Sequence, residues 1–440
     1  MTPPTGLVRS STRFADGVKA SPDLALALST VLVGVVYVWV VSPGLPYDEP
    51  SHWSNVLFYA DHWSLPILGH PGVTYEAQMG PAAYVVDAIV VRLVRIAGLP
   101  LDTAFRLVRL LGVVELAGAV LVMAALAKRL LPRSPATTAA VAVFALNPML
   151  LTMSASVQND TLALLLGLLA LHLTFVLLDE RPSVGAATVV AGVAGLAVLA
   201  KLTAWPIIVA IPAWLLWRHG WSAFKASAAF LVSVCALTGW WFVRNVVLYG
   251  DPSASAGVGK VGLSFPPYHV HGLGGIGHIV EEVVTYLWLP TEYVRNTISA
   301  PTVLKAALLA ASVAVVSAGI RDRHRLQSGA SLVIGCGLIA VVSWLALYLE
   351  AQASPPRLAY LALPMWTALV ALAIGRLRRP LYVIGVAVAL VALNAWTLTE
   401  ISRVNASRFG LTANTRTSDN RLSDRAAPAL LNGRDRAERE

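Results

Sequence analysis

Long apolar runs constrain the fold of this chain more than any other feature. A helix needs about 20 residues to cross the hydrocarbon core of a bilayer. Only 13% of the 440 residues are charged, against about 25% in soluble domains. The sequence therefore predicts an all-α, polytopic membrane bundle with eleven crossing runs, at about 22–42, 107–127, 136–156, 161–178, 184–200, 203–217, 226–248, 301–319, 329–349, 358–375 and 380–398.

A twelfth apolar stretch, residues 80–97, contains Asp87, Arg92 and Arg95. Three charges at bilayer depth are costly, so we expect a juxtamembrane or re-entrant helix that does not cross. With eleven crossings the arginine clusters at 321–325 and 376–379 face the cytoplasm, as the positive-inside rule requires. The N-terminus then lies inside and the C-terminus outside the cytoplasmic membrane.

Two outer segments are long, 43–106 and 249–300, and each holds a predicted amphipathic helix, at 50–63 and 276–288. Helices of this kind lie in the membrane interface. We assign residues 1–400 to one transmembrane domain and 401–440 to a polar, flexible tail. The net charge of +9 comes largely from arginines that end apolar runs, which does not indicate a nucleic-acid partner.

An acidic group follows the first apolar run. Asp48 and Glu49 are adjacent, and His52 comes one helical turn later. Neighbouring carboxylates repel each other and persist where water, a cation or a chemical task compensates. The group is a candidate for general-base chemistry or, through Asp48, for metal binding. The alternative is that these acids only favour a helix N-terminus.

Further polar residues stand at the predicted outer edge. Asn159 and Asp160 separate two apolar runs, where Asp160 could serve as a helix N-cap. Lys201, Arg244 and Arg357 end apolar runs on the same side. These cations either extend to the membrane surface or form a pocket for a lipid phosphate.

The order of these features resembles the GT-C superfamily of polytopic glycosyltransferases, which includes protein O-mannosyltransferases and the lipid A aminoarabinose transferase. The resemblance spreads over most of residues 22–375. Its elements are the pair Asp48-Glu49, Glu76 with Gln78 before a Pro-aromatic helix, Asn147-Pro148, Asn159-Asp160, Lys201-Leu202-Thr203, Trp241 to Asn245, and Arg357 before Pro364. Relatives often carry a Lys or a second Pro near the position of Glu76, where this chain has Gln78, Met79 and Gly80.

The resemblance implies an inverting transfer of sugar from a polyprenyl-phosphate carrier to an acceptor hydroxyl on the outer face of the membrane. Phosphate leaves without a general acid, so one carboxylate suffices as base. We expect Asp48 to be that base, with Glu49, His52 and Asp160 orienting it or the sugar. The expected substrate-binding residues are Glu76, Gln78, Asn159, Lys201, Arg244 and Arg357. A divalent metal on Asp48 and Asp160 is a further hypothesis.

Two other function classes remain open at this stage. A flippase or transporter of lipid-linked glycans would place its charges near the bilayer midplane, whereas the charges here gather at one edge. A non-catalytic subunit of an envelope-assembly machine would need no open site beside the acids.

Overall fold

The structure is a computed structural model. It describes residues 21–409 apart from 45, 47, 133, 261–268, 292–297, 299, 328, 351–355 and 378–380. Tyr47 and residues 410–440 of the predicted tail therefore lie outside the described residues. The described part is helical and contains no strand, so the predicted all-α class is confirmed.

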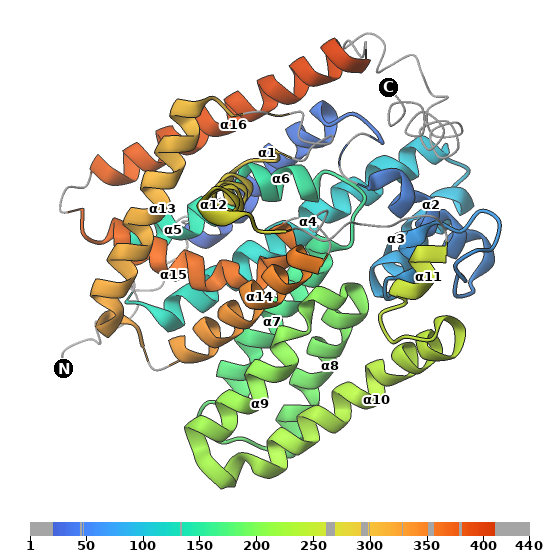
Figure 1. The fold of residues 1–440 in the computed structure, drawn as a ribbon, viewed down its shortest axis with the longest axis horizontal. Coiled ribbons are helices and arrows are strands. Elements are labelled where there is room, and N and C mark those ends of the chain that lie inside the picture. The colour runs from blue at the N-terminus through green and yellow to red at the C-terminus, as the bar shows by residue number, and fades with distance from the viewer. Residues whose placement is uncertain are drawn as a thin grey trace, which may run out of the picture.

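Figure 1 shows the helices in chain order. The α-helices are α1 (Pro22–Val40), α2 (Glu49–His62), α3 (Ala82–Ile96), α4 (Leu101–Leu130), α5 (Pro135–Ala145), α6 (Pro148–Ser154), α7 (Asp160–Leu177), α8 (Val184–Ala200), α9 (Pro206–His219), α10 (Phe224–Tyr249), α11 (Ser255–Lys260), α12 (Gly272–Trp288), α13 (Thr302–Asp322), α14 (Ala330–Glu350), α15 (Leu363–Ile374) and α16 (Leu381–Phe409). Short 3₁₀ turns are η1 (Tyr75–Gln78), η2 (Leu202–Ala204), η3 (Gly220–Ala223), η4 (Arg323–Arg325) and η5 (Pro356–Ala362).

Eight segments of the described chain are long and apolar enough to cross a membrane, or nine if the bent pair α5 and α6 forms one span. One of the eight, Leu202–Tyr249, comprises α9 and α10 joined by η3. Helix α8 is apolar but shorter. The count of eleven crossings therefore stays a prediction. Helix α16 continues to Phe409, and the division into a transmembrane domain and a tail stays a prediction.

The predicted run 136–156 is broken in the structure. Helix α5 ends at Ala145, and α6 begins at Pro148 after a bend of 46°. Proline lacks the N–H that a continuous helix needs. The side chain of Asn147 accepts hydrogen bonds from the N–H groups of Met149 and Leu150, which caps the new helix.

Helix α3 is not among the described helices that could cross a membrane. Instead it packs on α2 and α4. Arg92 donates to the carbonyl of Ala60 over 2.7 Å, and Arg95 pairs with Asp61. This agrees with the prediction of a juxtamembrane helix, because two of its three charges, Arg92 and Arg95, contact α2.

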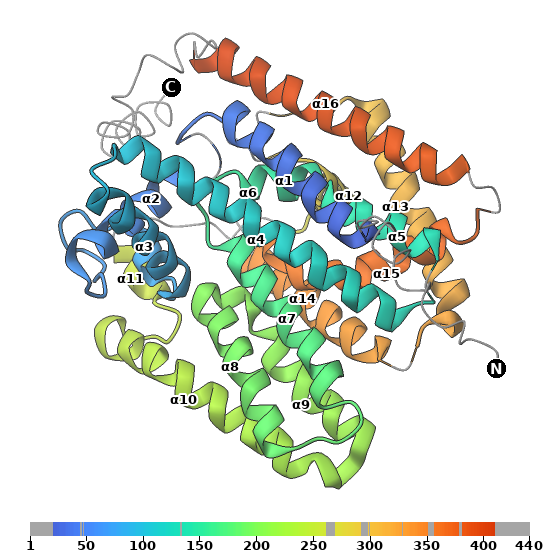
Figure 2. The same cartoon turned by 180° about the vertical axis from the view of Figure 1, so that it is seen from behind.

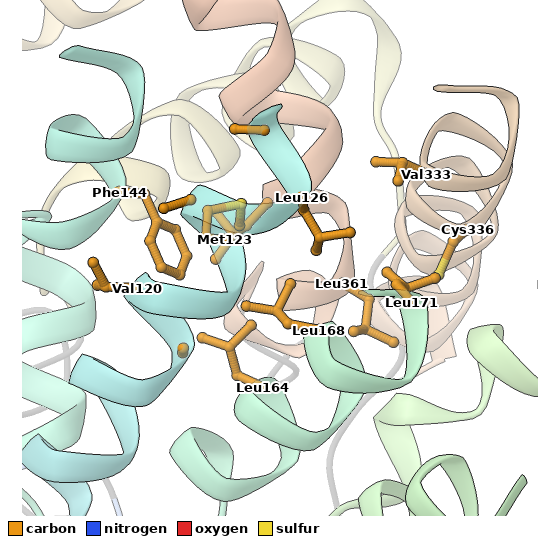
Figure 3. Close-up of a cluster of buried hydrophobic side chains, with 14 of the residues drawn as sticks. Val120, Met123, Leu126, Phe144, Leu164, Leu168, Leu171, Val333, Cys336 and Leu361 are labelled. Carbon is orange, nitrogen blue, oxygen red and sulfur yellow. The ribbon is translucent and has the colours of Figure 1, made fainter. Parts of the chain in front are cut away.

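The core forms where α4, α5, α7, α14 and η5 meet. Figure 3 shows side chains from each of these elements pointing toward one another, among them Met123, Phe144, Leu168, Cys336 and Leu361. Figure 2 shows α1 and α4 side by side on the other side of the bundle. This packing holds the start of α7, which carries Asp160, and η5, which carries Arg357.

Candidate active site

Four of the predicted residues meet in one charge cluster, which we define as Asp48, Asp160, Lys201 and Arg357. Nζ of Lys201 lies 2.6 Å from Oδ1 of Asp160. The guanidinium of Arg357 lies 3.9 Å from Oδ2 of Asp160 and 3.5 Å from Oδ2 of Asp48. Segments more than 300 residues apart in the sequence thus converge, and their formal charges sum to zero.

The two carboxylates of the charge cluster differ in their access to solvent. Asp48 is the N-cap of α2, and its side chain is 34% exposed. Asp160 is the first residue of α7, and its side chain is only 2% exposed. The N-cap of α7 is Asn159, so the alternative of Asp160 as the cap is wrong. Asp48 is therefore the open carboxylate and Asp160 the enclosed one.

Glu49 lies in a different environment from Asp48. It is fully buried and forms a two-point ion pair with Arg109 of α4, with distances of 2.6 and 2.8 Å. Its carboxylate also accepts hydrogen bonds from the N–H groups of Gly44 and Val157. Four donors hold its two oxygens, so Glu49 connects the first loop to α4 and to the start of α7.

Arg109 is a functional residue that the sequence analysis missed. Besides Glu49, it donates to the carbonyls of Val38, Val41 and Ser42 at the end of α1. It lies inside the apolar run 107–127, and no role was predicted for it there. Its contacts with Glu49, Val41 and Ser42 hold the chain on both sides of Asp48. The only sign of this role in the sequence is a positive charge inside an apolar run.

His52, Glu76 and Tyr84 form a second buried group, from α2, η1 and α3. Nδ1 of His52 lies 2.8 Å from the hydroxyl of Tyr84, which donates to Oε2 of Glu76 over 3.3 Å. Nε2 of His52 lies 3.6 Å from Oε1 of Glu76. Burial lowers the pKa of His52 to about 3 and raises the pKa of Glu76 to about 8.

The remaining predicted residues do not join the charge cluster by any contact within the described part of the chain. Arg244 stacks over the ring of Trp241 and donates to the carbonyl of Pro66 over 2.5 Å. Gln78 is half-buried at the end of η1. Asn159 is buried, and neither polar atom of its side chain has a hydrogen-bond partner among the described residues.

An apolar cavity of about 410 Å³ adjoins the charge cluster. It is lined by α6, α12, α13, α14, η5 and α15, and Arg357 belongs to its wall. Val280, Val283 and Leu287 of α12 face it. The sequence predicted that this apolar face of α12 lies in the membrane interface, and the structure places it against the cavity instead. Six elements build the cavity, so no local pattern could have predicted it.

The residues present do not fit the divalent metal that the sequence analysis considered for Asp48 and Asp160. Oδ1 of Asp160 is bound by Lys201, and Arg357 lies beside both carboxylates. Among the described residues no group of three His, Cys, Asp or Glu side chains could hold a metal ion. Metal ligands need free oxygens without competing cations, so we derive no chemical step through a metal.

Part of the chain matches a known protein family. Residues 88–242 match the family model described as dolichyl-phosphate-mannose-protein mannosyltransferase. This range includes Asp160 and Lys201, whereas Asp48 and Arg357 lie outside it. No curated protein matches the sequence.

Solved structures match over most of the chain. ArnT from Cupriavidus metallidurans bound to undecaprenyl phosphate has a TM-score of 0.51 and 14% identity, over 86% of this chain and 73% of that one. The oligosaccharyltransferase AglB from Archaeoglobus fulgidus, in complex with an inhibitory peptide and a dolichol-phosphate, has a TM-score of 0.52 and 11% identity, over 87% and 56%. The fold is that of the GT-C glycosyltransferases. The chain spans about half the length of the archaeal enzyme it matches.

Proposed function

We propose that this protein transfers a sugar from a polyprenyl-phosphate donor to an acceptor hydroxyl on the outer face of the cytoplasmic membrane. One observation supports this most strongly. Arg357 lines the apolar cavity and also lies 3.5 Å from Asp48. A polyprenyl phosphate joins an apolar chain to an anionic head, and this arrangement offers a place for each part.

The charge cluster suits a donor that arrives as an anion. Arg357 can present two N–H groups to a phosphate, and Lys201 supplies a second cation close by. Both cations are buried and held by Asp160, so they are positioned before the substrate binds. Positioned cations stabilise the charge that develops on the leaving phosphate.

Asp48 is the proposed general base because its side chain is 34% exposed, whereas those of Glu49, Glu76 and Asp160 are at most 2% exposed. Glu49 is held by four donors, Asp160 is paired with Lys201, and Glu76 has a raised pKa. Asp48 is the half-exposed acid of the group, so an acceptor hydroxyl can reach it. A single displacement assisted by Asp48 inverts the configuration of the anomeric carbon.

The likeness to other proteins supports the donor class. The matched family model is named for a dolichyl-phosphate-mannose enzyme, and two matched structures contain undecaprenyl phosphate or dolichol-phosphate. Both carrier lipids, dolichol phosphate and undecaprenyl phosphate, are polyprenyl phosphates. The acceptor in this proposal is a cell-envelope glycan, lipid or protein that carries a hydroxyl.

The two other function classes find less support. A flippase needs a polar path through the bundle, whereas the cavity beside Arg357 is almost wholly apolar. A non-catalytic subunit needs no half-exposed acid within reach of a buried arginine, such as Asp48 provides beside Arg357.

Replacing Asp48 tests the proposal. Asp48→Asn keeps the shape of the side chain and removes the proton acceptor, so the rate should fall by roughly 10²–10⁴. The assay follows labelled sugar from polyprenyl-phosphate mannose, or another polyprenyl-phosphate hexose, into the envelope fraction of membranes that contain the protein. Asp61→Asn is the matched control, since Asp61 lies on the same helix α2 and pairs with Arg95. Transfer by Asp48→Asn at the parental rate would show that Asp48 is not the base.

A further inference from the structure

The apolar cavity beside the charge cluster has a buried inner part. Met149 of α6 and Tyr286 of α12 line this part, and both residues are at most 3% exposed. They pack together with Met153, whose sulfur lies 3.4 Å from the guanidinium of Arg357. The inner part of the cavity therefore lies next to the cation that we propose for the donor phosphate.

Helix α13 forms an outer rim of the same cavity. Leu309, Val313 and Val316 line the cavity from this helix, and they are 42%, 57% and 43% exposed. Figures 1 and 2 both show α13 at the edge of the bundle. Because α13 is long and apolar enough to cross the membrane, its exposed apolar side chains face lipid. The rim of the cavity therefore borders the hydrocarbon of the bilayer.

The volume of the cavity limits how much of a polyprenyl chain it can hold. The cavity measures about 410 Å³. A carbon group of the size of a water molecule takes about 30 Å³ at liquid density, so an isoprene unit of five carbons takes about 150 Å³. The cavity therefore has room for roughly three isoprene units. A longer carrier must leave the rest of its chain outside the cavity.

The parts of the chain inside and outside the cavity contribute differently to binding. Lipid tails are as apolar as the side chains at the rim, so no hydrophobic driving force holds the outer part of the chain against the protein. Inside the cavity, space that a short chain leaves unfilled deprives the walls of contact atoms, which costs free energy. Affinity should therefore depend on chain length only until the cavity is full.

We infer that the protein recognises only the first three or so isoprene units after the phosphate of its donor and does not select among longer carriers. The phosphate binds at Arg357, the first units fill the cavity, and the remaining chain passes the rim on α13 into the bilayer. This inference rests on the proposed function for the class of the donor, and it adds which part of the carrier the protein recognises.

A series of isoprenyl phosphates with two, four and eleven units tests this inference. Each ligand displaces a fluorescent undecaprenyl phosphate from the full-length protein in lipid nanodiscs, and affinities are compared at equal mole fraction in the bilayer. This comparison removes differences in partition between water and lipid. The four-unit ligand should bind about tenfold more tightly than the two-unit ligand, which leaves part of the cavity unfilled. The eleven-unit ligand should bind within about twofold of the four-unit ligand.

Val283→Trp links the chain-length series to the cavity. Val283 lines the cavity from α12, and an indole ring there takes space that the chain would fill. The tenfold gain between two and four units should therefore fall to less than about threefold in this variant. Val243→Trp is the matched control, because Val243 lies on α10, is 64% exposed and is not among the residues that line the cavity. This control should keep the parental series.

Three results would overturn the inference while the proposed function stands. The first is an affinity that keeps rising from four to eleven units, because the protein would then bind chain beyond the cavity. The second is equal affinity for all three ligands in the parent, and the third is a full tenfold gain that persists in Val283→Trp. A different result contradicts the proposed function itself: if the parent binds neither the fluorescent undecaprenyl phosphate nor any ligand of the series, the proposed class of donor is wrong.

Discussion

Replacing Glu49 with glutamine tests whether this acid holds the site together or takes part in the chemistry. Each oxygen of Glu49 accepts two hydrogen bonds, one from Arg109 and one from a backbone N–H. Whichever oxygen the amide nitrogen replaces, it would face two donors. Removing one partner of a buried ion pair costs about 3–5 kcal/mol, and both Glu49 and Arg109 are at most 1% exposed.

The expected result for Glu49→Gln is a loss of about 3–5 kcal/mol of unfolding free energy. Reversible unfolding in detergent micelles measures this loss, and sugar transfer is measured separately for each folded molecule. Glu49→Gln combined with Arg109→Met should recover part of the lost stability, because the double change removes the unpaired buried charge.

Two outcomes would refute this reasoning. If Glu49→Gln unfolds like the parent and has lost transfer, Glu49 orients the base or the sugar, as the sequence predicted. If the double variant is less stable than either single variant, the ion pair is not the source of the effect.

Two further predictions concern Gly80, in the loop between η1 and α3, and the apolar cavity. A Cβ at Gly80 would collide with the backbone of Leu199, just before Lys201, so Gly80→Ala should lower both the melting temperature and the rate of transfer. Gly192→Ala on α8 is the control, because a Cβ there meets nothing within 4 Å. It should leave the melting temperature unchanged or raise it. If both changes lowered the melting temperature equally, the collision at Gly80 would not be the cause. Val283→Trp should fill part of the apolar cavity and weaken binding of polyprenyl phosphate at least tenfold while the protein stays folded. Unaltered affinity in a binding titration would show that the lipid lies elsewhere.

The sequence predicted those features that depend on local composition. The apolar runs became helices because a chain in a bilayer must satisfy its backbone hydrogen bonds internally. The positions of Asp48, Asp160, Lys201 and Arg357 at the ends of such runs placed them on one side of the membrane, and the structure brings them together.

Features that depend on distant partners could not be predicted in this way. Glu49 looked equivalent to Asp48, and only its contact with Arg109, 60 residues later, separates the two. Likewise Arg244 ends an apolar run as Lys201 does, but it contacts Pro66 instead of an acid of the charge cluster. The break at Pro148 had a visible signal, since proline interrupts helices.

The most direct test of the proposed function compares two arginines that the sequence could not distinguish. Arg357 borders the cavity and the charge cluster, whereas Arg244 binds the carbonyl of Pro66. Affinity for polyprenyl phosphate is measured at pH 7 for Arg357→Gln and Arg244→Gln. A charge-assisted contact contributes about 1.5–3 kcal/mol, so Arg357→Gln should bind roughly ten- to a hundredfold more weakly, and Arg244→Gln should bind like the parent. Unchanged affinity of Arg357→Gln, or a loss confined to Arg244→Gln, would contradict the proposed position of the lipid phosphate.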